Sequence, residues 1–443
     1  MGTRLSVGPP ELPADAPLPG LGADQLGATH DVVVIGAGVI GLSIALRLLL
    51  AVPGRRVLVI DREGVAAGAS RGNAGAYAFS DIQPLASPGI WRQVPRWLVD
   101  PLGPLALRPA YLPQITPWLL RFAMASRPSH VDASIRAQVA LNRLSAEATP
   151  RLLASIDAAA MLHEDGNLHL YETEAQWRAS LPGWQQRAAH GIAFEHAHGA
   201  AALARWQPGL SPALTVGTFV PGWSTIDDPL VLVQRLAERC AAQGARLRRA
   251  QATVVAPGAD GVHVHRAEGA PLRARQVVVA AGAWSHRLAV TLGERIPLET
   301  ERGYNTTLPP GAFPLTRQLT FPDHAFVVTP IGGGVRVGGA VELGGLEAEP
   351  DFRRADTLLT KARRFLPGLN PQGGTRWMGF RPSLPDSLPA IGASRHDPRV
   401  LYAFGHGHLG LTQSAATAEI VAALASGETP PIDLAPYRPQ RFI

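Results

Sequence analysis

Three glycines and one aspartate near the start of the chain have the types and spacing of a ligand-binding turn. Gly36, Gly38 and Gly41 follow an apolar run in a G-x-G-x-x-G pattern. Such glycines allow a tight turn, the close approach of a pyrophosphate, and close packing of a helix on a strand. Asp61 stands about 20 residues after Gly41, where a carboxylate can bind a ribose hydroxyl. The pattern therefore predicts a dinucleotide with an unphosphorylated ribose, FAD or NAD rather than NADP.

The elements that must position these residues can be predicted from the flanking sequence. Residues 31–35 form a β-branched run that is too apolar for a strand with one wet face, which favours a buried parallel strand. A helix follows, and its N-terminus favours negative charge. Residues 57–60 predict a second buried strand that ends at Asp61. The alternative is an ordinary glycine-rich turn in a β–α–β unit without a ligand.

A second stretch of small residues lies soon after the first. Residues 68–75 read GASRGNAG, and such residues let the backbone lie against a flat or anionic ligand. Alone, this stretch would be an ordinary flexible loop. Because it follows a dinucleotide pattern, we interpret it as a second contact with the cofactor.

Composition excludes several classes of protein. The 443 residues are 46% hydrophobic and 17% charged, as expected of a globular chain that is long enough for two domains. The net charge is +6, but the basic residues are scattered, so nucleic-acid binding is not expected. Cys240 is the only cysteine, which excludes an intramolecular disulfide, a CxxC pair and a cysteine cluster for a metal. We expect a buried thiol there, with a covalent link to a cofactor as the minor alternative.

Two segments bear on location and partners. Residues 1–29 are rich in Pro, Gly and Ala and lack the features of a signal peptide, so they are predicted to be a flexible leader. No apolar run is long enough to span a membrane, which favours a cytoplasmic location. Residues 88–125 contain several Trp, Pro and Leu residues and predict short helices over a core. The alternative is a docking surface for a partner subunit or for the inner face of the cell membrane.

The order of predicted elements implies two interleaved domains. Buried strands of the parallel type are expected at 31–35, 57–60, 276–281 and 399–404, with antiparallel material between them. Residues 161–171 predict a hairpin, and residues 174–190 a helix. Asp228 followed by Pro229 predicts a helix start. The proline-rich stretch MGFRPSLPDSLPAIG predicts a loop, and the chain ends in strand, glycine loop and helix.

At this point the chain resembles the FAD-dependent D-amino acid oxidase superfamily, most closely its bacterial D-amino acid dehydrogenase branch. The resemblance runs from about residue 30 to 430. It is carried by VVVIGAGVIGLSIA, GASRGNAG, VVVAAGAWS, PLETERGY, GFRPSLPDSLPAIG and FGHGHLGLT. The first motif is shared by many dinucleotide-binding proteins, whereas the last three in this order are more specific.

The resemblance implies an α/β fold in which a two-dinucleotide-binding (Rossmann-like) FAD domain is interleaved with an α+β substrate domain built on an antiparallel sheet. The FAD domain would comprise residues 30–87, 226–296 and 381–433. The substrate domain would comprise residues 88–225 and 297–380, followed by a tail at 434–443. FAD would be bound without a covalent link, because no flavin-attachment motif is present. The residues implied in FAD binding are Gly36, Gly38, Val39, Ile40, Gly41, Asp61, Arg62, Ser70, Asn73, Ala74, Ala281, Gly282, Gly405, Gly407, His408, Leu409, Gly410 and Leu411.

Three further residues are implied in catalysis. Arg381 stands in the GFRP context of the family's carboxylate-binding arginine, and a guanidinium fork suits an amino-acid carboxylate. Tyr304, in ERGY, would offer a hydroxyl to the substrate, although a structural strand tyrosine is the alternative. Either His406 or its neighbour His408 would face the flavin or the substrate, and a structural histidine is again the alternative. Glu299, Glu301 and Arg302 are interpreted as structural ion-pairing residues.

The expected reaction is oxidative deamination of an amino acid, a D-isomer by the resemblance, in amino acid catabolism. Hydride would pass from Cα of the neutral amine to flavin N5, and the imino acid would hydrolyse to a 2-oxo acid. Quinone or oxygen would reoxidise the flavin. Three alternatives stay open: oxidation of secondary amines or glycine (D-proline, 4-hydroxy-D-proline, sarcosine), an electron-transfer subunit of a larger complex, and an NAD-linked dehydrogenase.

Overall fold

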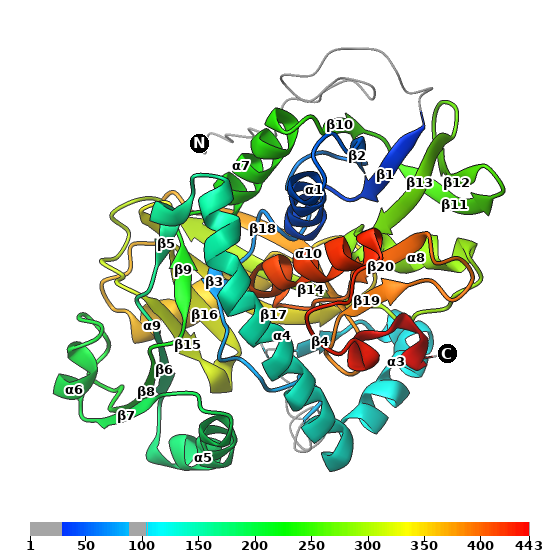
Figure 1. Cartoon of the computed structure of the whole chain (residues 1–443). Coiled ribbons are helices and arrows are strands. Elements are labelled where there is room, and N and C mark those ends of the chain that lie inside the picture. The colour runs from blue at the N-terminus through cyan, green and yellow to red at the C-terminus, as the bar shows by residue number, and fades with distance from the viewer. Residues whose placement is uncertain (1–28, 88–102, 104, 443) are drawn as a thin grey trace.

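The computed structural model describes residues 29–87, 103 and 105–442 (Figure 1). Its core consists of an eight-stranded sheet, a nine-stranded sheet and a small three-stranded sheet. Strands of both large sheets come from segments far apart in the chain. The two halves of the molecule are therefore interleaved in sequence, as the strand pattern predicted.

The eight-stranded sheet has a parallel centre, with β1 (His30–Ile35) flanked by β2 (Val57–Asp61) and β13 (Leu272–Val279). A fourth parallel strand, β20 (Val400–Phe404), pairs with β13. The four parallel strands predicted from the sequence are thus confirmed. The remaining strands of this sheet are β10 (Arg246–Arg249), β11 (Ala252–Gly258), β12 (Gly261–Arg266) and β19 (Ala390–Ala393).

Both faces of the parallel strands are buried, which explains their continuous apolar runs. On one face, Val32 and Val34 join a core with α1 (Val39–Ala51), α7 (Pro229–Ala242) and α10 (Gly410–Ser426). The long helix α4 (Pro128–Ser155) packs on α10 from outside (Figure 1). On the other face, Val33 and Ile35 pack against the β11–β12 hairpin and α8 (Ser285–Thr291).

The nine-stranded sheet is mostly antiparallel and combines β4 to β8 of the first half of the chain, without β5, with β14 to β18 of the second half. Its order is β18-β14-β17-β16-β15-β6-β8-β7, with β4 (Leu105–Leu107) paired to β17. Helix α9 (Arg353–Phe365) covers one part of it with a cluster of stacked phenylalanines. The bounds are β18 (Thr375–Ser383), β14 (Glu299–Leu308), β17 (Gly334–Leu343), β16 (Phe326–Ile331), β15 (Gln318–Phe321), β6 (Asn167–Tyr171), β8 (Val216–Val220) and β7 (Glu195–His198).

Smaller elements complete the fold. The three-stranded sheet contains β3 (Ala76–Tyr77), β9 (Ser224–Ile226) and β5 (Leu162–His163). The remaining α-helices of the described residues are α3 (Leu112–Ala125), α5 (Glu174–Ala189) and α6 (Ala200–Ala204). Helix α5 starts with a complete capping box at Thr173 and Gln176, and Asp228 caps α7, so both predicted helix starts are confirmed.

Two predictions of local structure are wrong. Residues 161–171 do not form a hairpin, because β5 pairs with β9 whereas β6 pairs with β8 and β15. The turn at Gly166 (φ +74°) sends the two strands into different sheets, and local patterns do not contain that information. The proline-rich stretch does not start as a loop, because β18 continues through Pro382 to Ser383. Proline is tolerated there since β18 is the edge strand of its sheet.

The segments predicted to contact partners are described only in part. The leader 1–29, apart from Thr29, and Trp91 and Trp97 lie outside the described residues. Trp118 of α3 is buried and stacked on Phe122, whereas Leu120 and Met124 are exposed on the same helix. Among the described helices, none combines the length and apolar character needed to cross a bilayer. The boundaries of the two domains stay a prediction, and residues 381–383 lie in the nine-stranded sheet as the end of β18.

Candidate active site

A cavity of about 1080 Å³ lies between the two large sheets. Its wall runs from the glycine turn after β1, along the loop at 68–75, to the strands β14, β17 and β18 of the nine-stranded sheet. All eighteen residues predicted to bind the cofactor lie on this wall except Gly41 and Gly405. The predicted catalytic residues Arg381, Tyr304 and His406 also border it.

The glycine turn has the geometry that its pattern predicts. Gly36 has φ +119°, and a Cβ there would lie 2.2 Å from the carbonyl oxygen of Ala280. Gly41 does not line the cavity because its role is packing, since a Cβ would lie 1.9 Å from the carbonyl oxygen of Gly36. Both contacts involve backbone that cannot move away. A larger residue at Gly41 would push α1 away from the turn after β1, and one at Gly36 would collide with the backbone that follows β13.

The start of α1 is suited to an anion. Gly38, its N-cap, has no side chain to accept the first N–H groups, and the first turn contains no acidic residue. Ser70 accepts the N–H of Val39 at 3.0 Å and joins the second small-residue loop to the helix. A helix N-terminus with this composition favours negative charge, as a pyrophosphate would supply.

Asp61 connects the end of β2 to the glycine turn. One carboxylate oxygen accepts the N–H of Ala37 at 2.9 Å, and the other accepts the N–H groups of Glu63 and Gly64. A carboxylate has room for a fourth hydrogen bond, so these contacts leave one for a ribose hydroxyl. Its neighbour Arg62 lies over the ring of Trp284, with Cζ 3.5 Å from the ring centroid.

The loop at 68–75 is held against the nine-stranded sheet. The amide of Asn305 donates to the carbonyl of Gly72 at 2.9 Å, and Arg336 donates to the carbonyl of Asn73. Asn73 also accepts the N–H of Gly75 and so fixes the turn. Ala74 follows on the cavity wall. The small residues predicted to lie along a cofactor are therefore ordered by side chains of the opposite sheet.

The last glycine loop forms the other end of the cofactor wall. Gly405 and Gly407 have φ values of +86° and +54°, in the region that favours glycine. Gly405 does not line the cavity. A Cβ at this position would point toward Leu384 and lie 2.5 Å from its side chain. Helix α10 begins at Gly410 with neither a side-chain cap nor an acidic residue in its first turn. Ala281 and Gly282 close the wall at the end of β13.

Glycines flatten the part of the nine-stranded sheet that faces the cavity. Gly303 of β14 is paired with Gly379 of β18, and Gly338 of β17 is paired with Asn305. The indole of Trp377 fills the space above Gly379, since a Cβ there would lie 1.9 Å from the ring. The absence of side chains at Gly303 and Gly379 thus lets larger side chains of β18 lie flat on the sheet along the cavity wall.

Arg381 lies on this flat surface. A Cβ at Gly303 would lie 2.4 Å from the Cζ of Arg381, so the guanidinium rests directly on that glycine. Its Nη1 donates to the carbonyl of Ala340 at 3.0 Å and its Nη2 to that of Gly339 at 3.4 Å. A guanidinium has five N–H groups, so three remain for a ligand. Burial lowers the pKa of Arg381, an effect that the charge of Glu301 opposes.

A bulge in β17 directs the two carbonyl groups that hold Arg381. The pairing of β14 with β17 shifts between Arg302 and Tyr304. At this shift, Ala340 has φ +54°, which is uncommon for a residue with a side chain. The bulge turns consecutive carbonyls of β17 toward the arginine.

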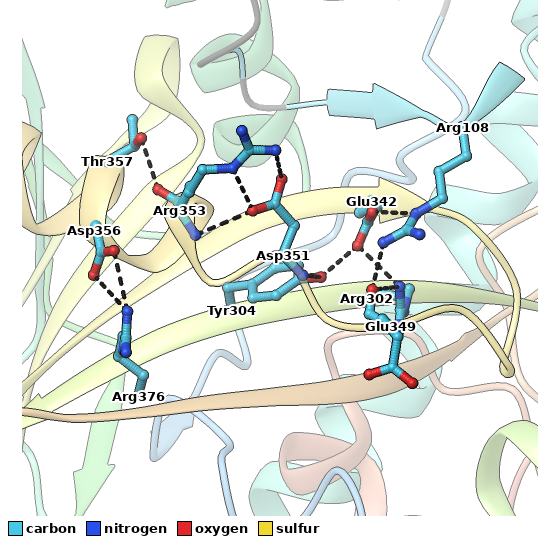
Figure 2. Close-up of polar contacts among 10 residues, drawn as sticks. All are labelled: Arg108, Arg302, Tyr304, Glu342, Glu349, Asp351, Arg353, Asp356, Thr357 and Arg376. Atoms are coloured by element: carbon cyan, nitrogen blue, oxygen red, sulfur yellow. Dashed lines mark hydrogen bonds and ion pairs between the residues drawn. The ribbon is translucent and has the colours of Figure 1, made fainter. Parts of the chain in front are cut away.

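The predicted role of Tyr304 is not supported by the structure. Its hydroxyl donates to Glu342 and accepts the N–H of Asp351 at 3.1 Å (Figure 2). Glu342 is also bonded by Arg108 and Arg302, which makes a buried polar cluster behind the sheet. Burial and the hydrogen bond to Glu342 raise the pKa of Tyr304 to about 12. These contacts occupy the hydroxyl and favour the alternative interpretation of a structural strand tyrosine, while the catalytic role stays a prediction.

The two histidines of the last glycine loop have different environments. His406 is buried, with Nε2 3.0 Å from Thr417 Oγ1, and burial lowers its pKa to about 3. Thr417 belongs to α10, so this contact holds the ring against that helix, and the catalytic role of His406 stays a prediction. His408 lies 3.2 Å from Asp81, and although burial acts to lower its pKa, the hydrogen bond and charge of Asp81 raise it. His408 is therefore the histidine with a charged partner on the cavity wall.

Seven charged or titratable residues of the cavity wall were not predicted as site residues: Glu63, Asp81, His169, Arg187, Arg287, Glu301 and Arg336. Arg187 of α5 lies 3.7 Å from Asp81, and burial with the charge of Arg187 lowers the pKa of His169 to about 3. These residues come from separate elements that meet only in the folded protein. The sole sequence signal was for Glu301, which stands two residues before Gly303 in the ERGY motif but was interpreted as structural.

Comparison with known proteins agrees with this site. A sequence model described as FAD dependent oxidoreductase matches residues 31–424. A D-amino-acid oxidase of Bradyrhizobium diazoefficiens is 35% identical over 419 residues, which cover 93% of this chain and 99% of the relative. A D-amino acid dehydrogenase of Vibrio cholerae serotype O1 is 31% identical over 412 residues, 90% of this chain and 96% of the relative.

Solved structures show the same fold. Glycine oxidase from Geobacillus kaustophilus superposes with a TM-score of 0.75 at 21% identity, covering 94% of this chain and 99% of that one. The glycine turn, the uncapped α1 and Asp61 are the features that bind the adenine dinucleotide part of such a cofactor. The residues present therefore fit the FAD that the matching family description names.

Proposed function

Because the chain belongs to the family of FAD dependent oxidoreductases and FAD is its cofactor, we propose that it oxidises the Cα–N bond of a D-amino acid to an imino acid, which water converts to a 2-oxo acid. The observation that carries the proposal is Arg381. It is the guanidinium on the flat cavity surface, and three of its N–H groups are left for a ligand. A carboxylate is the group that such a fork binds best.

FAD, when bound, supplies the two-electron acceptor for this oxidation. The protein's part is to bind and orient the substrate. Arg381 fixes the carboxylate and thereby the position of Cα. Such positioning can lower the activation free energy of a reaction by up to about 7–11 kcal/mol. The side chains around Arg381 also exclude water, which strengthens the ion pair with the substrate. The reacting amine must be neutral, so a substrate that enters as an ammonium has to lose one proton before the Cα–N bond is oxidised.

The D configuration and the primary amine are supported by the relatives. Both curated relatives above are named for D-amino acids, one as an oxidase and the other as a dehydrogenase. We propose that this chain shares the substrate class, that FAD is held without a covalent bond, and that the reacting enzyme needs no second type of subunit. Secondary amines and glycine form the competing substrate class.

The test is anaerobic reduction of the purified, FAD-loaded protein by a panel of D-amino acids, L-amino acids, D-proline, sarcosine and glycine. Loss of flavin absorbance with D-amino acids is expected, and bleaching only by sarcosine, glycine or D-proline would move the enzyme to the secondary-amine class. Reoxidation by air and by a soluble quinone then identifies the acceptor. Release of the flavin by acid precipitation shows that it is not covalently bound.

Arg381 has a matched control on the same strand. Arg376 lies near the opposite end of β18 from Arg381. It is exposed and forms an ion pair with Asp356 of α9. Arg381→Ala is expected to lower kcat/KM by a factor of about 100 or more, because a charged hydrogen-bond pair is lost and the substrate is misplaced. Arg376→Ala is expected to leave it unchanged. Equal activity of the two variants would contradict the proposed role of Arg381.

A further inference from the structure

Glu301 is a buried glutamate that has no role in the substrate binding described above. It is 5% exposed and lies on the cavity wall. In the pairing of β14 with β18, Glu301 stands directly opposite Arg381. Side chains of directly opposed residues project from the same face of a sheet. Both charged groups therefore face the same part of the cavity.

The carboxylate of Glu301 receives no hydrogen bond from the described residues, unlike its neighbours. Glu299, two residues earlier on the same strand, accepts the Tyr111 hydroxyl at 2.9 Å. Glu342, on the adjacent strand, has Arg108, Arg302 and Tyr304 as partners. Buried carboxylates are normally paired in this way, because an isolated charge is costly to remove from water. Within the described part of the chain, no residue donates a hydrogen bond to the buried Glu301 carboxylate, so it can accept one from a ligand.

Arg381 does not neutralise Glu301 directly. The charges influence one another, since Glu301 opposes the lowering of the Arg381 pKa, yet the two side chains form no ion pair within the described structure. Instead, Arg381 is anchored to two consecutive carbonyl groups at the bulge of β17, those of Gly339 and Ala340. A cation and an anion are consequently held side by side, each with unused hydrogen-bonding capacity.

We propose that Glu301 binds the amino group of the substrate, so that Arg381 and Glu301 together select a zwitterionic α-amino acid. This inference rests on the proposed function and names a substrate-binding residue of the same site. An α-amino acid carries its carboxylate and its ammonium on one carbon, which matches two opposite charges on neighbouring strands. The zwitterion adds no net charge to a site in which Arg381 and Glu301 already carry opposite charges.

Loss of the Glu301 charge should affect two classes of ligand in opposite ways. An amino acid loses a charge-assisted hydrogen bond when Glu301 is replaced by the isosteric glutamine. A simple carboxylate such as propanoate has no amine, and in the unaltered protein its negative charge must lie near that of Glu301. Like charges repel strongly where water is excluded. Removing the charge of Glu301 should therefore weaken the binding of the amino acid but not that of propanoate.

The experiment compares FAD-loaded wild type, Glu301→Gln and Glu299→Gln. Propanoate affinity is measured by the change in flavin absorbance, and D-alanine is measured by kcat/KM and by anaerobic reduction. For Glu301→Gln we expect kcat/KM for D-alanine to fall about 10- to 100-fold, mainly through KM, while propanoate binds equally well or more tightly. Glu299→Gln keeps an oxygen acceptor for Tyr111 and should change neither value.

Other outcomes overturn the proposal. If Glu301→Gln weakens both ligands equally, the glutamate only maintains the shape of the site, and if it changes neither, the amine is bound elsewhere. FAD content and melting temperature of each variant show whether the protein has folded. If the wild type oxidises no amino acid, the proposed function fails by itself. D-Alanine then serves as an unreactive ligand, and the same comparison with propanoate still tests Glu301.

Discussion

Replacing Gly303 by alanine should disable substrate binding without harming the fold. The new Cβ would lie 2.4 Å from both Cζ and Nη2 of Arg381 and 2.9 Å from Nη1. Ordinary contact begins at 3.4 Å, so the guanidinium must retreat by about 1 Å. A misplacement of about 1 Å can lower a rate about 100-fold. We therefore expect kcat/KM for the best D-amino acid to fall by about that factor.

The same substitution should be harmless to stability. The clashing atoms are the end of a flexible side chain, and Gly303 has no positive φ that an alanine would strain. Alanine in a strand also reduces the freedom of the unfolded chain, which is worth about 0.4–1 kcal/mol where no strain results. The melting temperature and FAD content should thus be unchanged or slightly raised.

Steady-state kinetics and a thermal melt of the purified variant provide the assay. The control is Gly41→Ala, whose Cβ would lie 1.9 Å from the backbone oxygen of Gly36. That clash cannot be relieved by a side chain, so loss of FAD and a lower melting temperature are expected together. If Gly303→Ala retains full kcat/KM, the position of the guanidinium against Gly303 is not needed for activity. The assignment of Arg381 as a fixed, bidentate carboxylate-binding residue would then be refuted.

Three more outcomes follow from the buried groups. Glu342→Ala leaves the fully buried Arg302 without its carboxylate partner and should lower the free energy of unfolding, measured by chemical denaturation, by about 3–5 kcal/mol. A decrease of less than about 1 kcal/mol would contradict a stabilising buried ion pair. Asp81 has a lowered pKa, so its contribution to stability is present above pH 3.8 and is lost as the pH falls. His408 has a raised pKa, so its contribution is present below pH 6.5 and is lost as the pH rises through that raised pKa. Asp81→Asn should therefore lower the melting temperature more at pH 5.5 than at pH 9, and an equal loss at both would refute the pairing. Burial raises the pKa of Cys240 to about 12, so a thiol reagent should label the protein only after unfolding.

The sequence was most informative where local spacing determines structure. The turn at Gly36 and Gly41, the strand that ends at Asp61 and the capped start of α7 depend on neighbouring residues, and each was predicted from them. The choice of partner strand depends on distant residues, which is why β5 and β6 were wrongly joined into a hairpin.

The site was predictable only where a motif carried it. Arg381 was predicted from its GFRP context and lies on the cavity wall, but no local pattern shows that the hydroxyl of Tyr304 contacts Glu342. Alternation along β14 places Glu301 and Gly303 on one face and Arg302 and Tyr304 on the other, once the sheet and its cavity are known. The pairing of Asp81 with His408 joins residues more than 300 positions apart, and a single sequence contains no sign of it.

The position of β13 has a consequence for how the enzyme is made. This strand lies between β1, at the start of the described chain, and β20, near its end. During synthesis the N-terminal glycine turn leaves the ribosome early, but its supporting sheet stays incomplete until residues beyond 270 emerge. The wall that α10 contributes arrives only after residue 410. Cofactor capture must therefore be a late event, and a nascent chain interrupted before residue 400 would expose unpaired apolar strands to chaperones and proteases.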